Sequence, residues 1–184
     1  MNPVDIIAEY YRPGSSLYEI QVVHGKQVAR KALDTAKKVL HMAPDLDLIE
    51  EASMLHDIGI FQTRAIPIGC HGRHPYVVHG YLGRVILEKK GMMQHALICE
   101  RHVGVGLTAK NIKVGQIPLP VRDMVPITLE EKIVCFADKF FSKEPDSAGK
   151  EKSVEDILNG LARYGQEKVD TFRAWLAFFG VGSC

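Results

Sequence analysis

The segment Ala52-Ser53-Met54-Leu55-His56-Asp57-Ile58-Gly59 places an imidazole and a carboxylate side by side at the end of an apolar stretch of helical character. Burying such a pair costs free energy unless a charged partner holds the two side chains together. A divalent metal ion does so, because its charge keeps the carboxylate ionised and the imidazole neutral. The His-Asp pair therefore predicts a metal site if the rest of the chain supplies further ligands.

Further ligands occur at wide intervals, each within or beside an apolar stretch with helical spacing, so they can converge from separate helices. Asp138 is the most persuasive, because it interrupts the apolar run 133–141, where an unpaired carboxylate would be costly. For His79 the alternative is a surface position beside a packing glycine, and for His102 it is a cap at a helix C-terminus. The expected ligand set is His24, His56, Asp57, His79, His102 and Asp138.

The order of these residues, with Ile58-Gly59 directly after the pair, resembles the HD superfamily of metal-dependent phosphohydrolases, and more narrowly its HDIG-type branch. The resemblance covers roughly residues 20–142. It implies that Asp57 and His56 are the catalytic pair and that Asp57 can bridge two metals. A first ion would be held by His24, His56, Asp57 and Asp138, and a second by His79 and His102 together with Asp57.

The reaction implied by the resemblance is hydrolysis of a phosphoester or phosphoanhydride in a small phosphorylated substrate, with a nucleotide favoured. The single histidine of Arg101-His102-Val103, followed by small residues, resembles the branch that hydrolyses diadenosine tetraphosphate symmetrically. The Gly-Lys of cyclic-di-GMP phosphodiesterases is absent after the pair, since Ile60 follows Gly59, so that substrate is disfavoured. A non-catalytic nucleotide-binding sensor and a di-iron oxygenase of HD fold are the alternatives. The complete ligand set disfavours the first, and the absence of additional oxygenase motifs disfavours the second.

Imidazole and carboxylate ligands suit a divalent transition metal such as Fe, Mn, Co or Ni, with Zn and Mg as alternatives, at one or two ions per chain. Bound metals of this kind activate water and clamp phosphate oxygens. Cationic side chains near the ligands are expected to bind the phosphate. For each of them a solvated charge or a structural ion pair is the alternative. The candidates are Arg73, His74, Arg122 and Lys139.

Composition is that of a globular protein: of the 184 residues, 46% are hydrophobic and 24% are charged. A net charge of +1 argues against a stable nucleic-acid partner. No apolar run approaches the length of a membrane span, and the N-terminus does not resemble a signal peptide. The four cysteines, Cys70, Cys99, Cys135 and Cys184, are far apart, which favours a reduced, cytoplasmic setting.

Helix signals dominate, and no strand pattern is convincing, so we expect an all-α, HD-domain-like helical bundle. One domain should span residues 1–184, with C-terminal helices at 153–179 packing on the HD core. Helix starts are predicted at Ser15 or Ser16, near Asp45, at Pro75 and at the capping box of Thr128. Gly59 is expected to end a helix, and segments 61–73 and 103–127 to be loops. Lysines 143, 150 and 152 alternate with acids, which is typical of a solvated loop, and the aromatic C-terminus is expected to form core or a homodimer contact.

Overall fold

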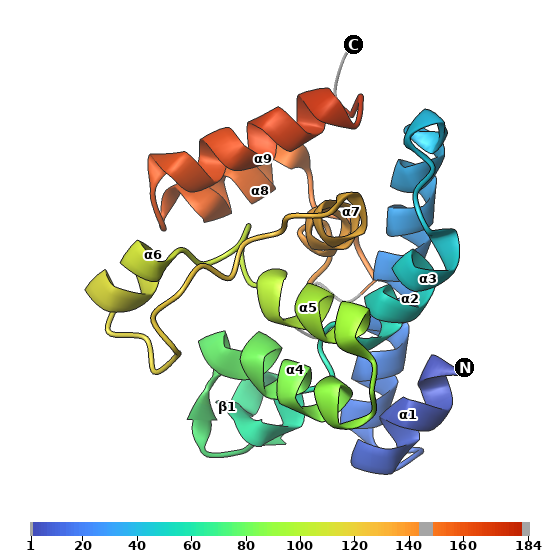
Figure 1. Ribbon diagram of the computed structural model, residues 1–184. Coiled ribbons are helices and arrows are strands. Elements are labelled where there is room, and N and C mark those ends of the chain that lie inside the picture. The colour runs from blue at the N-terminus through green and yellow to red at the C-terminus, as the bar shows by residue number, and fades with distance from the viewer. Residues whose placement is uncertain (1, 144–148, 182–184) are drawn as a thin grey trace.

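The computed structural model describes residues 2–143 and 149–181, and helices make up most of this part of the chain (Figure 1). The predicted all-α fold class is confirmed. The α-helices are α1 (Pro3–Tyr10), α2 (Ser16–Lys37), α3 (Leu46–Leu55), α4 (His79–Lys89), α5 (Met93–Arg101), α6 (Ala109–Val114), α7 (Leu129–Asp138), α8 (Val154–Ala162) and α9 (Gln166–Phe178).

Most predicted helix starts are confirmed by side-chain caps that accept a backbone N–H left without a helical partner. The Ser15 hydroxyl accepts from the amide of Tyr18 at the start of α2, and Asp45 caps α3 in the same way. At α7 the capping box is complete, because Thr128 and Glu131 each accept from the other's backbone amide. Pro75 does not begin α4, since a 3₁₀ turn, Tyr76–Val78, precedes it and the α-helix begins at His79.

Segment 61–73, expected to be a loop, instead contributes to a small sheet with the order β2-β1-β3. Strand β1 (Thr63–Ala65) pairs antiparallel with β2 (Cys70–His71) and parallel with β3 (His74–Pro75). Strands of two or three residues are too short to show an alternating pattern, so the sequence carries no signal for them. Helix α6 has only 6 residues, which is too short to show helical periodicity, so the sequence predicts no helix within 103–127.

Two apolar clusters form the core, and α3 and α5 contribute to both. One cluster joins α1, α4 and the small sheet, whereas the other joins α7 to α8 and α9, which lie together at the top of Figure 1. Phe136 of α7 is fully buried and its ring lies 5.1 Å from that of Phe172 in α9. Trp175 and Phe179 of α9 are buried in the same cluster, so these C-terminal aromatics are core residues.

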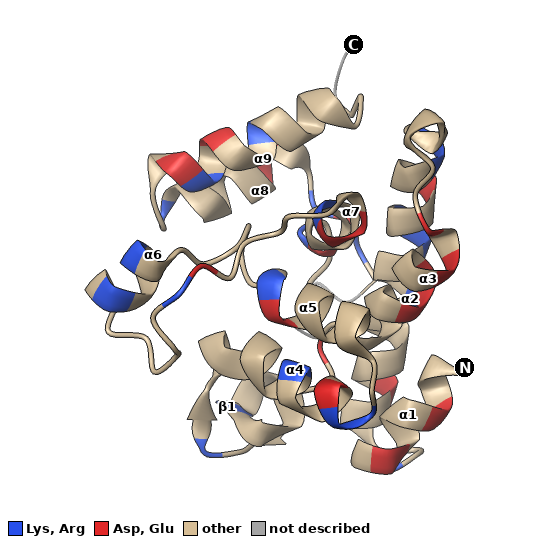
Figure 2. Ribbon diagram, in the orientation of Figure 1, with Lys and Arg blue, Asp and Glu red and all other residues tan. Residues whose placement is uncertain are grey.

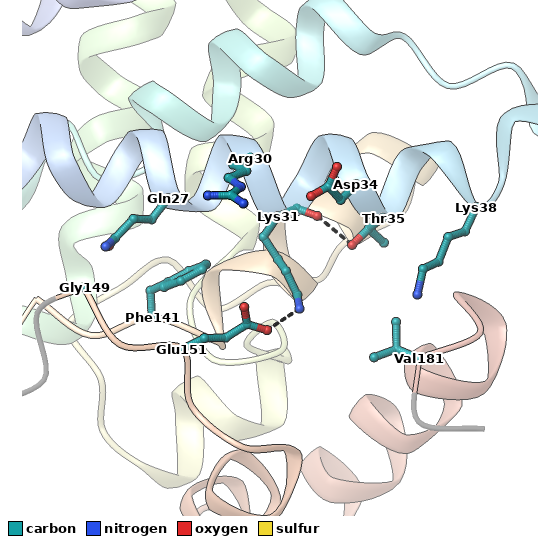
Figure 3. Close-up of a pocket in the computed structure, with 10 residues that line it drawn as sticks. All are labelled: Gln27, Arg30, Lys31, Asp34, Thr35, Lys38, Phe141, Gly149, Glu151 and Val181. Atoms are coloured by element: carbon teal, nitrogen blue, oxygen red, sulfur yellow. Dashed lines mark hydrogen bonds and ion pairs between the residues drawn. The ribbon is translucent and has the colours of Figure 1, made fainter. Parts of the chain in front are cut away.

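Acidic and basic residues both occur along α9 (Figure 2). In the described part of the chain, no helix combines the length and the apolarity that crossing a bilayer requires.

Candidate metal centre

The six predicted ligands come together although they lie on five separate segments. His24 projects from the middle of α2, and His56 and Asp57 directly follow α3. The remaining three stand at helix ends, where α4 begins and where α5 and α7 finish. All six are buried: His24, His56, Asp57, His79, His102 and Asp138.

The ligand atoms fall into two groups that share Asp57. In the first, Oδ2 of Asp57 lies 3.3 Å from Nε2 of His24 and 3.0 Å from Nε2 of His56. Oδ1 of Asp138 closes this group at 3.1 Å and 3.3 Å from the same two nitrogens. In the second, Oδ1 of Asp57 lies 3.1 Å from Nε2 of His79 and 3.5 Å from Nε2 of His102. One carboxylate thus presents a different oxygen to each pair of imidazoles.

The hydrogen bonds of three histidines leave Nε2 as the ligand atom. In His56, His79 and His102, Nδ1 lies 2.6 Å from the carbonyl oxygen three residues earlier, which can only accept a hydrogen bond, so Nδ1 is the donor. Such an arrangement orients metal-binding imidazoles in many proteins. Nε2 of His79 and Nε2 of His102 are only 3.0 Å apart, and two neutral imidazoles facing each other in this way repel unless a cation lies between them.

Asp57 gives a second indication that the site suits a metal. Both of its carboxylate oxygens are buried without a hydrogen bond of good geometry, and only Oδ2 has a cationic side chain beside it, Lys143 at 2.5 Å. Buried polar atoms are normally satisfied, so Oδ1 lacks a partner that a divalent cation would supply. The residues present therefore fit a metal ion, in one group or in both.

Electrostatics keep the shared carboxylate ionised. Burial by itself would raise the pKa of Asp57, but His56 and Lys143 hold the pKa well below its usual range. Burial would also lower the pKa of His56, yet Asp57 and Asp138 raise it to about 9. For His102, burial is the largest influence and lowers the pKa to about 3, so its imidazole is neutral. A metal ion held by the first group would need the neutral form of His56.

The turn that carries the His-Asp pair is fixed by close packing rather than by a glycine cap. The prediction that Gly59 ends a helix is wrong, since α3 ends at Leu55 and Gly59 has an ordinary φ of −85°. A Cβ atom at Gly59 would lie 2.3 Å from the carbonyl oxygen of His79 and 2.4 Å from the amide nitrogen of Gly83. Glycine is needed here because α4 crosses directly over the turn, which sets His79 against Asp57.

Two lysines stand beside the ligands, and only one of them was expected. Nζ of Lys139 lies 2.8 Å from Oδ2 of Asp138, which agrees with its predicted place near the site. Nζ of Lys143 lies 2.5 Å from Oδ2 of Asp57, and its side chain is only 11% exposed. The expectation of a solvated loop is therefore wrong for Lys143. Its alternating charged context gives no sign of burial, and only the packing behind α7 reveals it.

None of the other predicted phosphate-binding residues lines the cavities that border the ligands. Arg73 and His74 are exposed. Arg122 makes a two-pronged ion pair with the buried Glu100, at 2.5 Å and 2.8 Å. Arg84 of α4 also pairs with Glu100. Because Glu100 lies in α5, its pair with Arg122 holds the 103–127 segment against that helix. A role for these three residues in binding substrate stays a prediction.

Two cavities open beside the metal centre, and both are lined by Tyr76, Asp138, Lys139 and Lys143. The larger has a volume of about 500 Å³ and is lined mainly by apolar groups, which include the 103–107 segment and Leu161 of α8. The smaller, of about 320 Å³, is bounded by the small sheet and the segment after α7. A phosphate between the two lysines would therefore have room for substituents on either side.

Comparison with known proteins adds the family. The sequence profile of the HD domain matches residues 22–142, about two thirds of the chain. The chain belongs to the HD domain family. All the predicted ligands lie within the HD match.

Three curated relatives share parts of this HD chain. An uncharacterized protein of Methanocaldococcus jannaschii is 43% identical over 96 residues, which is 51% of this chain and 48% of that protein. The tRNA (cytidine(56)-2'-O)-methyltransferase of Thermoplasma volcanium is 30% identical over 159 residues, covering 85% of this chain and 40% of the relative. The enzyme of the same name from Picrophilus torridus is 37% identical over 101 residues, covering 54% and 26%. The chain thus spans less than half the length of these relatives. No solved structure matches it significantly.

Proposed function

We propose that this chain is a metal-dependent phosphohydrolase that cleaves a phosphoester or phosphoanhydride bond of a small phosphorylated substrate. The observation that carries the proposal is the sharing of Asp57 between two groups of imidazoles, His24 with His56 and His79 with His102. A buried carboxylate with a ligand group on each of its oxygens suits one or two divalent ions and has no evident purpose in packing alone.

The chain's own residues bind, orient and enclose the substrate. Divalent metals held by this set would supply the Lewis acidity that activates water and neutralises phosphate charge. Hydrolysis joins the water oxygen to phosphorus and breaks the bond from phosphorus to the leaving oxygen, which takes up a proton. Asp57 would orient the attacking water, because both its oxygens face the ligand groups. Lys139 provides a fixed positive charge beside Asp138.

A nucleotide is the substrate class that the larger cavity favours. Its volume of about 500 Å³ is within the range of small-molecule sites. Val103, Gly104 and Leu107 supply apolar surface on which a nucleobase can lie, and Lys139 and Lys143 line the same cavity. Symmetrical cleavage of diadenosine tetraphosphate belongs to this proposal as its narrowest form, since the small residues after His102 line the same cavity.

The names of two relatives raise a second candidate, an action on tRNA. Those names describe whole proteins, of which this chain matches 40% and 26%. The buried His and Asp set favours attack on phosphorus over methyl transfer, because such ligands bind metal and activate water. If tRNA is the substrate, we therefore expect the chain to hydrolyse a phosphoester bond of the tRNA.

The test is a substrate panel incubated separately with Mn²⁺, Co²⁺, Fe²⁺ and Ni²⁺. It includes nucleoside mono-, di- and triphosphates, diadenosine tetraphosphate, a cyclic nucleotide and tRNA. We expect one class to release phosphate or a shortened nucleotide, with loss of turnover in the Asp57→Asn variant. Thermal stabilisation without any product would identify a non-catalytic sensor, and oxygen consumption with a polyol would identify an oxygenase. Either result would overturn the proposed hydrolase.

A further inference from the structure

Lys143 inserts a buried ammonium group into the metal centre. It follows α7 by five residues, and no part of the family match reaches it, since that match ends at residue 142. Its Nζ lies 2.5 Å from Oδ2 of Asp57, and the side chain lines both cavities beside the ligands. Lys143 therefore borders both cavities and also contacts the carboxylate that joins the two ligand groups.

The ammonium group contacts the same oxygen that a metal in the first group would use. Oδ2 of Asp57 is the oxygen within 3.3 Å of Nε2 of His24 and 3.0 Å of Nε2 of His56. A divalent ion and an ammonium group cannot both remain against one carboxylate oxygen without strong repulsion between like charges. Metal binding at this oxygen therefore requires Lys143 to give up its contact or an anion to lie between the two cations.

Lys139 is in a different position, and the contrast between the two lysines is informative. Lys139 pairs with Oδ2 of Asp138, whereas Oδ1 of that residue faces His24 and His56. A metal in the first group can take Oδ1 and leave the pair with Lys139 intact. Lys143 contacts Oδ2 of Asp57, and this oxygen is also the one that faces His24 and His56. The ammonium group and a metal in the first group would therefore need the same atom.

We propose that Lys143 is a phosphate-binding residue that neutralises Asp57 in the metal-free protein and moves to the substrate's phosphate when metal binds. The proposal rests on the proposed hydrolase function. A phosphate oxygen placed between the metal and Nζ removes their repulsion, and both cavities give it access to this point. Metal binding and phosphate binding are thereby coupled: the first releases the ammonium group that the second needs.

The experiment is calorimetric titration of the full chain with Mn²⁺, and then of the Mn²⁺-loaded protein with inorganic phosphate. The variant Lys143→Met keeps an unbranched side chain one atom shorter and removes the charge, and Lys143→Arg keeps the charge. Lys150→Met is the control, because Lys150 is an exposed lysine of the same region. Melting temperatures are measured alongside, and Lys143→Gln replaces Lys143→Met if that variant does not fold.

We expect Lys143→Met to bind Mn²⁺ at least as tightly as the wild type, since a competing cation is gone. Its affinity for phosphate should fall by about 10- to 100-fold, the effect of losing one charge-assisted hydrogen bond. Lys143→Arg should retain most phosphate binding, and Lys150→Met should match the wild type in both titrations.

Two results would overturn the role of Lys143 while leaving the hydrolase proposal standing. One is unchanged phosphate affinity in a folded Lys143→Met or Lys143→Gln variant. The other is weaker Mn²⁺ binding in that variant, which would mean that Lys143 holds Asp57 in place for the metal. A wild-type protein that binds no divalent metal would instead overturn the proposed function, and the role of Lys143 with it.

Discussion

At the scale of single residues, Asp57 is the position on which the metal centre depends most. Each of its two oxygens faces a different pair of imidazoles, so no other ligand can replace it in both groups. The flanking ligands each serve only one group. A change at Asp57 should therefore affect all the metal that the chain binds.

We predict that Asp57→Asn lowers turnover by at least about 100-fold, because loss of even an outer partner of a metal ligand typically costs 10- to 100-fold. Metal content measured by elemental analysis should fall in parallel, while circular dichroism stays that of the folded chain. Asp47→Asn, an exposed carboxylate in α3, is the matched control and should retain metal and activity. Full metal content in Asp57→Asn would contradict the shared-ligand assignment.

The raised pKa of His56 leads to a second prediction at this scale. Its imidazole holds a proton up to about pH 9 in the metal-free protein, because Asp57 and Asp138 outweigh the effect of burial. A metal needs the neutral form, so binding at neutral pH should release a proton, and metal affinity should rise with pH until about 9. His102 is already neutral, with a pKa of about 3, and should release none.

Titration with Mn²⁺ in two buffers of different ionisation enthalpy, repeated at several pH values, counts the released protons. An equal heat in both buffers at pH 7.5 would contradict the prediction for His56.

At the scale of elements, the contact between α4 and the turn after α3 sets the second ligand group. Gly59 leaves no room for a side chain beneath His79 and Gly83. We predict that Gly59→Ala destabilises the chain by about 1–3 kcal/mol or more, as expected for an overpacked site, and weakens metal binding by moving His79 away from Asp57.

The control for Gly59 is Gly160→Ala in α8, where a Cβ atom would meet nothing within 4 Å. Alanine is favoured over glycine inside a helix, so this change should stabilise the chain by about 0.5–1 kcal/mol. Chemical denaturation of both variants gives the two free energies of unfolding. An unchanged free energy of unfolding in Gly59→Ala would show that α4 can shift without loss of stability.

Several elements could be predicted from sequence because their signals are local. The Thr128 capping box and the Asp45 cap involve residues three positions apart, and apolar periodicity marks the longer helices. The strands β1, β2 and β3 could not be predicted, since each is held by pairing with a neighbour rather than by its own pattern. Gly59 does not end a helix, and the contact that requires a glycine there comes from α4, some twenty residues later in the chain.

At the scale of the whole molecule, the C-terminal helices extend the core beyond the segment that matches the HD family. Phe172 of α9 is fully buried against Phe136 of α7, the helix that carries Asp138. We predict that Phe172→Ala costs about 3–5 kcal/mol of stability, the usual penalty for emptying such a position. Phe178→Ala, whose side chain is 49% exposed, should cost less than about 1 kcal/mol.

The single tryptophan of the chain makes it possible to test whether these helices belong to one domain with the rest. Trp175 is buried in α9, so its fluorescence follows the C-terminal helices, whereas far-ultraviolet circular dichroism follows all helices. We expect both signals to change at the same denaturant concentration, as in a two-state unfolding of one domain. Separate midpoints would mean that α9 unfolds independently.

The sequence by itself determined the helical class and the identities of the ligand candidates, because buried acids and imidazoles in apolar helical stretches are visible in the order of residues alone. Only the tertiary structure decided which oxygen of Asp57 faces which histidines, that Arg122 is held by Glu100, and that Lys143 enters the centre. These contacts join residues separated by 22 to 86 positions or depend on side-chain direction within a group. Packing between distant segments determines these contacts, and no local sequence pattern indicates such packing.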